Sequence, residues 1–376
     1  MITTASVLRE RGSVRPYEAS TPLRVEPVSL DEPGFGEVLI KITAAGVCHS
    51  DLSVVNGDRP RPLPMALGHE SAAVVQQVGA GVTQVQPGDH VVTVFVPSCG
   101  VCSPCREGRS ALCESAAAAN AAGTLLSGER RLKDVDGAVL HHHLGVSSFA
   151  QHAVVSENSL VVIDSNIPPE IAALFGCAVL TGVGAVVNTG RLRAGQSVAV
   201  IGLGGVGMAA LIGAVAAGGA EVIAVDTSAE KLHLARELGA TRTFKADEAA
   251  VEQIRDATGG GVDLAVETAG VIPALETAYQ GTRRGGTTVT ASLPHPSATW
   301  PIAPTTLVAE ERTLRGSYLG SSVPTRDVPR YLKLWRAGRL PVDRILGEQF
   351  ALADINVALD RLEQGQALRQ VVMMDD

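Results

Sequence analysis

The sequence lacks an excess of positive charge. It carries 31 lysines and arginines against 39 aspartates and glutamates, which gives a formal net charge of −8. This balance argues against nucleic acid or an anionic membrane surface as the main partner, although it leaves room for a local basic pocket that holds phosphates. Charged residues make up 19% of the chain and are mixed in sign, so we expect most of the chain to fold rather than stay disordered.

The N-terminal segment lacks an apolar core followed by a small-residue cleavage site. We therefore predict no secretion signal and a cytoplasmic location. One uncharged stretch, Val198 to Ala220, is long enough for a membrane span by length alone. Its many glycines, and the charged helical pattern that follows, favour a buried strand, turn and helix instead. The sequence also lacks internal repeats and long low-complexity segments.

Four of the six cysteines crowd into one short segment as Cys99, Cys102, Cys105 and Cys113. Thiols two residues apart are poorly placed to bridge, and disulfides are rare in the cytosol. Four soft ligands on a short loop suit a closed tetrahedral zinc site, which would have a structural role because no position is left open for chemistry. An iron–sulfur cluster is the competing metal centre. A nucleic-acid-binding zinc ribbon is the competing function, and the acidic chain disfavours it.

The pattern of the chain changes near residue 196. Up to about Phe149, short β-type runs such as EVLIKITAAG and VVTVFV alternate with turn residues. From about Gln196, strand-like VAVIG and EVIAVD alternate with helix-like VGMAALIGAVAAG and SAEKLHLARELG, and DLAVETAG and GGTTVTAS continue the strands. This alternation predicts a parallel, doubly wound sheet. Thr227 and Glu230 have the spacing of a capping box, and Gly239 stands where a C-terminal cap glycine belongs.

The segment GLGGVG lies between the first of these strands and its helix, and contains Gly202, Gly204 and Gly207. The first glycine allows a tight turn, the second lets the backbone approach a pyrophosphate, and the third lets helix and strand pack closely. Asp226 ends the next strand, where its carboxylate would accept hydrogen bonds from the adenosine ribose and repel a 2′-phosphate. The pattern predicts a dinucleotide site that favours NAD over NADP. The alternative is a glycine-rich turn without a ligand.

Several motifs together resemble a known family. GVCHSD, LGHE, the four-cysteine segment, FGCAVLTGVG and GLGGVG stand in the order and at the spacings of the zinc-containing medium-chain alcohol dehydrogenases. HHHLGVSSFAQH is most similar to the branch that includes the horse-liver-type and formaldehyde dehydrogenases. The resemblance covers essentially the whole chain. It implies a GroES-like, mostly β catalytic domain over 1–178 with a zinc lobe at 97–115, a Rossmann coenzyme domain over 179–321, and a return to the catalytic domain over 322–376.

The resemblance also implies a second, catalytic zinc held by Cys48, His69 and Cys177. Taken one by one, these residues could equally be buried core groups. As a set, two thiolates and a neutral imidazole cancel the metal's charge and leave a fourth position for water or substrate. Glu70 lies beside them, as an alternative metal ligand or as a charge that tunes the metal. Asp51 matches the carboxylate that orients the ligating histidine.

In the mechanism that the resemblance implies, zinc makes an alcohol acidic enough to lose its proton, and hydride passes to NAD. Ser50 matches the hydroxyl that takes the proton. Horse-liver-type relatives place a histidine three residues later, where this chain has Ser53, so we expect water to carry the proton away. Phe95 and His143 match walls of the substrate pocket. The residues expected to contact the coenzyme are His49, Thr181, Gly202, Gly204, Gly205, Val206, Gly207, Asp226, Lys231 and Arg369.

The function implied is reversible oxidation of primary alcohols of medium size, aliphatic or aromatic, by a homodimer paired through its coenzyme domains. A thiol-dependent formaldehyde dehydrogenase is the first alternative. ESAAAANAA after Cys113 has no basic residue, which counts against glutathione, whereas Arg59 and Arg61 could serve another thiol. The second alternative is a non-catalytic nucleotide-binding adaptor with one zinc lobe. It would explain GLGGVG and the four cysteines, but not the catalytic set.

Overall fold

The computed structural model describes residues 1–365 and 368–374. Within them the chain forms two compact units. The first contains residues 1–177, 323–329 and the chain from 346 onward, and the second contains 178–322 and 330–345. The chain thus returns to the first unit at 323, one residue after the expected 322, but the return is not continuous because residues 330–345 pack with the second unit. There, Arg344 pairs with Glu237 and Arg339 donates a hydrogen bond to the carbonyl of Ala216.

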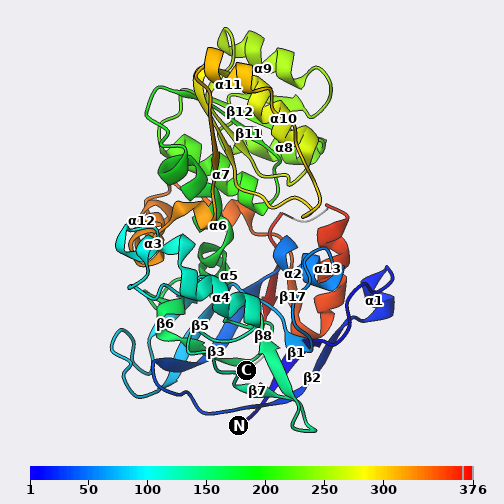
Figure 1. Ribbon diagram of the computed structural model, residues 1–376, viewed down its shortest axis with the longest axis vertical. Coiled ribbons are helices and arrows are strands. Elements are labelled where there is room, and N and C mark those ends of the chain that lie inside the picture. Colours follow the sequence, from blue (N-terminus) through cyan, green and yellow to red (C-terminus); the bar gives the residue numbers. More distant parts are fainter. Residues whose placement is uncertain (366–367, 375–376) are drawn as a thin grey trace. The chain divides into compact units, whose positions relative to one another are not determined.

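The second unit is built on a parallel six-stranded sheet with the order β13-β12-β11-β14-β15-β16 (Figure 1, green to orange). All five strand pairs are parallel. The inner strands are runs of valine, isoleucine and alanine that are buried on both faces, as parallel sheets covered by helices require. This arrangement confirms the predicted doubly wound fold. The strands are β11 (Ser197–Ile201), β12 (Glu221–Asp226), β13 (Arg242–Lys245), β14 (Val262–Glu267), β15 (Thr282–Thr290) and β16 (Thr313–Gly316).

Helices connect these strands and cover the sheet. Ala250 and Ile254 of α9 and Ala278 of α10 join the core that lines one face. The capping box predicted at Thr227 and Glu230 is wrong by one residue: Ser228 is the N-cap and accepts a hydrogen bond from the backbone of Lys231. The helices are α6 (Ala178–Gly184), α7 (Gly205–Ala216), α8 (Ala229–Glu237), α9 (Ala250–Thr258), α10 (Ile272–Gly281) and α11 (Pro304–Ala309), while α12 (Pro324–Arg336) belongs to both units.

The first unit is mostly β, as the resemblance implied. Five strands close a barrel in the order β1-β2-β7-β8-β4, and a second, seven-stranded sheet runs β10-β6-β5-β3-β18-β17, with β9 beside β3. The barrel strands are β1 (Ile2–Leu8), β2 (Leu23–Leu30), β4 (Met65–Ala66), β7 (Leu132–Lys133) and β8 (Val139–His142). The sheet strands are β3 (Glu37–Gly46), β5 (Ser71–Val78), β6 (His90–Thr93), β9 (His152–Ser156), β10 (Leu160–Ile163), β17 (Gln349–Ala351) and β18 (Val371–Met373).

Short helices complete the first unit. They are α1 (Tyr17–Ser20), α2 (His49–Val55), α3 (Ser103–Arg106), α4 (Glu114–Ala122), α5 (Pro169–Ala173) and α13 (Ile355–Glu363). Strand β3 follows the predicted run EVLIKITAAG over its whole length. Among the described residues, no single helix has the length and apolar character needed to cross a bilayer, although the bent helical pair 169–176 and 178–189 meets that test when its two parts are taken together.

Candidate metal centres and coenzyme turn

The register of the large sheet brings four distant segments together at one end. Strand β3 ends at Gly46, where it pairs with Val371 of β18 on one side, and its Ala45 pairs with Ser71 of β5 on the other. Cys48 follows β3 at the start of α2, His69 and Glu70 precede β5, and Arg369 precedes β18. These residues are therefore placed by backbone pairing, although they lie far apart in the sequence.

Cys177 reaches the same place through a close backbone approach. It follows the helical segment 169–176, and a Cβ on Gly176 would lie only 2.3 Å from the carbonyl oxygen of Thr93. Glycine is thus required for the chain to pass so near β6. The two Sγ atoms of Cys48 and Cys177 and one ring nitrogen of His69 all lie within 4.8 Å of one another.

This group fits a tetrahedral zinc ion. All three side chains are buried, and Nε2 of His69 has no hydrogen-bond partner among the described residues. An orphaned buried nitrogen is costly unless a metal or a donor fills the space in front of it. Ligands with zinc bonds of about 2.0–2.3 Å lie roughly 3.5–4 Å apart around the ion. The set leaves one tetrahedral position for another ligand, as in catalytic zinc sites.

The carboxylate of Asp51 orients the ring of His69. Its Oδ1 accepts a hydrogen bond from Nδ1 of His69 at 3.0 Å, and its Oδ2 accepts one from the backbone N–H of Cys48 at 3.0 Å. Burial opposes its ionisation, but His69 and His143 outweigh that effect and lower the pKa of Asp51 to about 2. The carboxylate is therefore charged at neutral pH. It fixes the proton on Nδ1 and turns Nε2 towards the two thiols.

The protonation pattern of the cluster favours a cation in its centre. A hydrogen bond from Cys177 shifts the pKa of the Cys48 thiol far below its ordinary value, and donating that bond raises the pKa of Cys177. Burial opposes protonation of His69, but Asp51 and Cys48 together raise its pKa well above the ordinary value. A metal ion that displaces the protons of His69 and Cys177 would satisfy all three groups at once.

Glu70 and Arg369 form a buried ion pair next to this cluster. Arg369 Nε donates to Oε1 of Glu70 at 3.0 Å, and Nη2 donates to Oε2. Burial raises the pKa of Glu70, while the guanidinium opposes that shift. Glu70, predicted as an alternative metal ligand, is thus engaged with Arg369, and it lies outside the group of three mutually close ligands. Arg369, predicted to contact the coenzyme, has this carboxylate as its partner.

The predicted pocket residues lie around the same histidine. The ring of Phe95 meets His69 edge to face with centroids 5.4 Å apart, and its carbonyl accepts a hydrogen bond from Asn120 of α4. His143 is buried and also meets His69 edge to face. Ser50 lies half-buried on α2 one turn before Ser53, whose hydroxyl donates to the Ser50 carbonyl at 2.9 Å, and His49 beside it is exposed.

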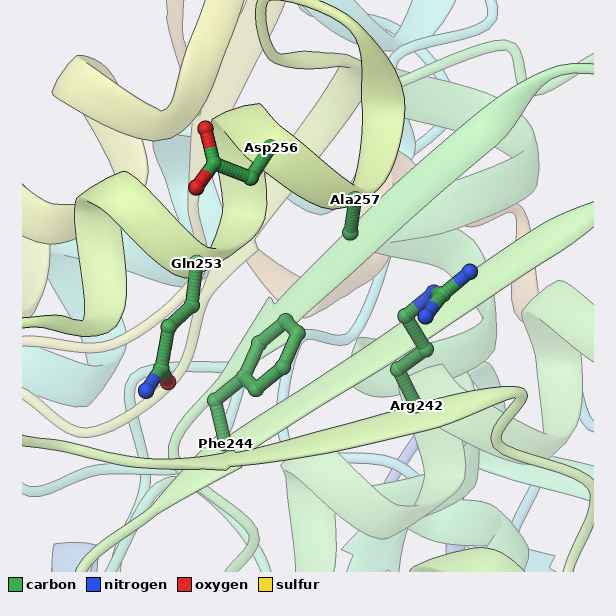
Figure 2. A pocket seen from close by; sticks show the side chains of 5 residues that line it. All are labelled: Arg242, Phe244, Gln253, Asp256 and Ala257. Carbon is green, nitrogen blue, oxygen red and sulfur yellow. The ribbon is translucent and has the colours of Figure 1, made fainter.

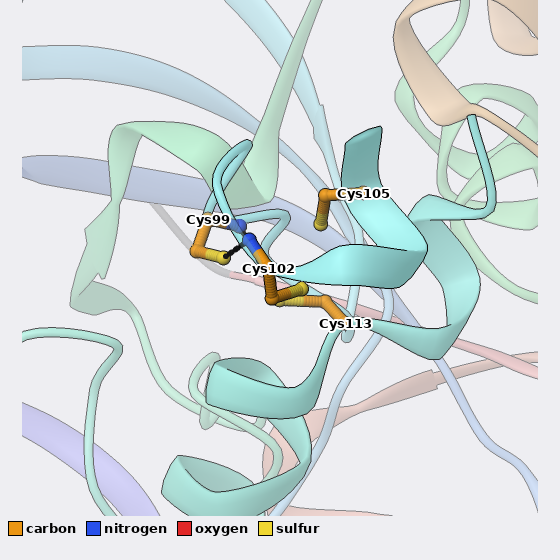
Figure 3. A group of neighbouring side chains, drawn as sticks. All are labelled: Cys99, Cys102, Cys105 and Cys113. Carbon is orange, nitrogen blue, oxygen red and sulfur yellow. Dashed lines mark hydrogen bonds between the residues drawn. The ribbon is translucent and has the colours of Figure 1, made fainter. Parts of the chain in front are cut away.

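The four-cysteine lobe forms a second potential metal centre (Figure 3). Its four Sγ atoms lie within 4.8 Å of one another, and all six cysteines of the chain are free of disulfides. Backbone N–H groups point at the sulfurs: Cys102 donates to Cys99, and Cys99 and Ala116 donate to Cys113. Hydrogen bonds from the N–H groups of Val101, the larger effect, and Cys102 lower the pKa of Cys99 to about 6, whereas burial raises that of Cys113 to about 12. A divalent cation would remove this conflict among the thiols.

The glycine turn has the geometry that its sequence predicted. Gly202 has φ +90°, a left-handed conformation that favours glycine. A Cβ on Gly207 would lie 1.8 Å from the Gly202 carbonyl oxygen, so helix α7 can approach the strand only with glycine there. A Cβ on Gly204, the N-cap of α7, would have no heavy atom within 4 Å. Gly204 thus faces open space at a helix N-terminus, where a phosphate binds well.

Other predicted coenzyme residues of the second unit lie on β12, α8 and α6. Asp226 ends β12, and its carboxylate accepts hydrogen bonds from the backbone N–H of Leu203 at 2.6 Å and of Ser228 at 2.8 Å. Each oxygen keeps lone pairs for further donors. Lys231 is half-buried in the first turn of α8. Thr181 lies on α6 next to Gly182, whose Cβ would collide with the carbonyl of Val206, so α6 and α7 are in close contact at this point.

One charged residue of this region was not predicted from the sequence. Glu267 ends β14 and is buried, and its carboxylate accepts four hydrogen bonds, from the N–H groups of Ala269 and Gly270 and from the hydroxyls of Thr290 and Ser292. It ties the carboxyl ends of β14 and β15 to the loops that follow them. The signal available was a lone acidic residue at the end of an apolar strand.

One cavity of the second unit lies elsewhere. It has a volume of 360 Å³ and is lined by the residues labelled in Figure 2, which belong to β13 and α9. Parallel sheets bind ligands outside the carboxyl ends of their strands. This cavity instead flanks the edge strand, where Arg242 pairs with Glu221. It is therefore not the predicted coenzyme crevice.

Comparison with known proteins agrees with this architecture. Residues 34–165 match the alcohol dehydrogenase GroES-like domain, and residues 205–336 match the zinc-binding dehydrogenase domain. The chain is 39% identical to a Mycobacterium tuberculosis protein provisionally named alcohol dehydrogenase D, over 99% of this chain and all of the relative. It is 38% identical to the NDMA-dependent alcohol dehydrogenase of Amycolatopsis methanolica, over 95% of this chain and 97% of the relative.

The fold is shared with solved enzymes. The benzyl alcohol dehydrogenase of Acinetobacter calcoaceticus superposes with a TM-score of 0.92 at 29% identity, with both chains covered completely. These matches define a GroES-like domain joined to a nucleotide-binding dehydrogenase domain. The chain belongs to the zinc-binding, medium-chain alcohol dehydrogenase family, and it is an oxidoreductase.

Proposed function

We propose that this protein oxidises primary alcohols to aldehydes, reversibly, with NAD as the hydride acceptor. The observation that carries the proposal is the convergence of Cys48, His69 and Cys177, with Nε2 of His69 lacking any other partner among the described residues. Zinc bound by these residues would act as a Lewis acid that makes an alcohol hydroxyl acidic at neutral pH.

The residues around the cluster have defined tasks in this proposal. Asp51 keeps the His69 ring in the tautomer that offers Nε2 to the metal. Ser50 accepts the proton of the alcohol. Because the hydroxyl of Ser53 already donates to the Ser50 carbonyl, the proton leaves through water rather than through a side chain at position 53. The apolar edge of Phe95 excludes water from the side of His69 that it covers.

The coenzyme part of the proposal rests on the second unit. The open space at Gly204 suits a pyrophosphate, and Asp226 lies at the end of β12, where a ribose would meet a negative charge. Replacement of Asp226 by asparagine keeps an acceptor for the Leu203 N–H and removes the charge. We expect D226N to lower the NAD-to-NADP ratio of kcat/KM by about tenfold or more, since hydrogen bonds to charged groups contribute about 1.5–3 kcal/mol. An unchanged ratio would contradict the NAD assignment.

The direct test is an activity screen of the purified, zinc-loaded protein. It should include NAD, NADP and NDMA as acceptors, because one relative is named for NDMA. Substrates should cover simple primary alcohols, benzylic alcohols and formaldehyde–thiol adducts. Activity only with thiol adducts would favour the formaldehyde dehydrogenase alternative, in which Arg61 would serve the thiol; at present Arg61 donates to the Asn120 carbonyl. An adaptor without a second metal is disfavoured by the three converging ligands.

We also propose that the protein is a cytoplasmic homodimer paired through its coenzyme unit. Strand β16 ends the six-stranded sheet and has β15 as its one strand neighbour within the described part of the chain. Such an edge is available for pairing with a second copy. Light scattering would give the mass of a dimer, and cell fractionation would test the location.

A further inference from the structure

His143 shares a carboxylate oxygen with the ligating histidine. Its Nδ1 lies 3.2 Å from Oδ1 of Asp51, the same atom that accepts the hydrogen bond from Nδ1 of His69 at 3.0 Å. The two imidazole rings meet edge to face, with centroids 5.5 Å apart and planes at 87°. The side chains of Asp51, His69 and His143 are all buried. One buried oxygen therefore faces two imidazoles.

The negative charge of Asp51 determines which ring nitrogen of His143 carries the proton. A lone pair on Nδ1 would face the negative oxygen at 3.2 Å, so the proton belongs on Nδ1. That N–H is not aligned for a directed hydrogen bond, and Nδ1 has no other partner among the described residues. The contact is thus an electrostatic attraction between the N–H dipole and the charge on Oδ1 of Asp51. Such attractions are stronger in the low-dielectric protein interior than in water.

A carboxylate that accepts a hydrogen bond from a ligating histidine raises the basicity of that histidine. Mutation of such a carboxylate alters metal affinity by about 10–100-fold. A second N–H group close to the same oxygen competes for its negative charge and weakens the hydrogen bond from His69. We propose that His143 is a positioning residue that limits how far Asp51 raises the basicity of His69, and that it thereby weakens the bond from Nε2 of His69 to zinc. This inference rests on the proposal that Cys48, His69 and Cys177 hold zinc.

The chemical consequence follows from charge balance. A weaker imidazole donor leaves the metal more electrophilic, which favours ionisation of a bound alcohol, and it also lets zinc dissociate faster. The His143 ring packs edge to face against His69, so the ring of phenylalanine should fit in its place. His143→Phe keeps a ring and removes both nitrogens. His143→Asn is the matched control, because its amide nitrogen takes nearly the place of Nδ1 and can still face Asp51.

The test is the rate at which purified, zinc-loaded protein releases zinc to an excess of chelator, followed with a zinc-sensitive dye. Cys177→Ser identifies the phase that belongs to the catalytic site, because that phase should be missing. We expect His143→Phe to slow this phase about tenfold, while His143→Asn remains close to wild type. The phase from the four-cysteine lobe should be unchanged in both. His143→Leu repeats the test if the phenylalanine variant does not fold.

Each outcome is decisive. A defect of packing alone would speed release, and in a destabilised protein it would speed both phases, so slower release of one zinc separates the proposed role from a structural one. Equal or faster release in His143→Phe, or slow release in His143→Asn as well, would overturn the inference. If wild-type protein lacks the phase that depends on Cys177, the proposed zinc site is wrong and the inference with it.

Discussion

Replacing Arg369 with methionine should leave the carboxylate of Glu70 buried without a cation. Their side chains are 4% and 0% exposed, and two hydrogen bonds join them. Removal of one partner from a buried ion pair costs about 3–5 kcal/mol, whereas replacing both by neutral groups of similar size is often nearly neutral. We therefore expect R369M to destabilise the first unit by about 3–5 kcal/mol. We expect the double variant E70Q/R369M to cost much less than the two single changes added together.

The coupling energy between the two positions is the quantity to measure. From the burial of both side chains we expect it to be about 2–3 kcal/mol. Urea unfolding of wild type, both single variants and the double variant gives the cycle. Because the chain has two compact units, unfolding need not be two-state. Hydrogen exchange of β3 and β18, which flank the pair, should therefore be used to assign each transition to a unit.

The same variants separate two roles for Arg369. If the arginine mainly holds Glu70, R369M loses stability and the coupling appears. If it mainly binds the coenzyme pyrophosphate, as the family resemblance implies, R369M weakens NAD binding while the stability of the first unit stays close to wild type. A cycle in which the costs of E70Q and R369M simply add would refute the argument from the buried pair.

Three further predictions concern single positions. Burial lowers the pKa of His142 to about 3, so below pH 6.5 the unfolded chain binds a proton that the folded chain does not. The free energy of unfolding of wild type should therefore fall by roughly 1.4 kcal/mol per pH unit relative to H142Q between pH 6.5 and 3. Equal pH slopes of the two proteins in urea unfolding would contradict this. G204A should fold normally, but fluorescence titration should show that it binds NAD at least about tenfold more weakly, because a Cβ would occupy the space for phosphate. G207A should also lose stability, because its Cβ would collide with the Gly202 carbonyl oxygen. Single-turnover hydride transfer in wild type should lack a histidine-like inflection near pH 6–7, which S53H should restore; a full inflection in wild type would count against proton exit through water.

Much of the fold could be predicted because local pattern and tertiary structure agree. The alternation of apolar strands and helices after residue 196 corresponds to the parallel sheet, and EVLIKITAAG forms β3 without a change of boundary. The capping box at Thr227 failed because Asp226 binds the N–H of Ser228, which keeps the chain in a turn for one more residue. The interruption of the last segment at 330–345 was not expected, because contacts such as Arg344–Glu237 are not local in sequence.

The candidate site also has a part that the sequence predicts by spacing and a part that it does not. The four cysteines of the lobe lie close in sequence, so their spacing alone indicated a metal. Cys48, His69 and Cys177 meet only through the pairing of β3 with β5 and the close passage at Gly176. The resemblance to a family supplied this set, and spacing could not. The contact of His143 with Asp51 was missed, because nothing in the sequence shows that two residues so far apart face one oxygen.

Zinc content tests the central claim most directly. The account predicts two zinc ions per purified chain, one for each group of converging ligands. Cys177→Ser should retain one zinc and lose alcohol oxidation, while its four-cysteine lobe keeps the other ion. A wild-type chain with a single zinc, or a Cys177→Ser variant with the same zinc content and activity as wild type, would contradict the account.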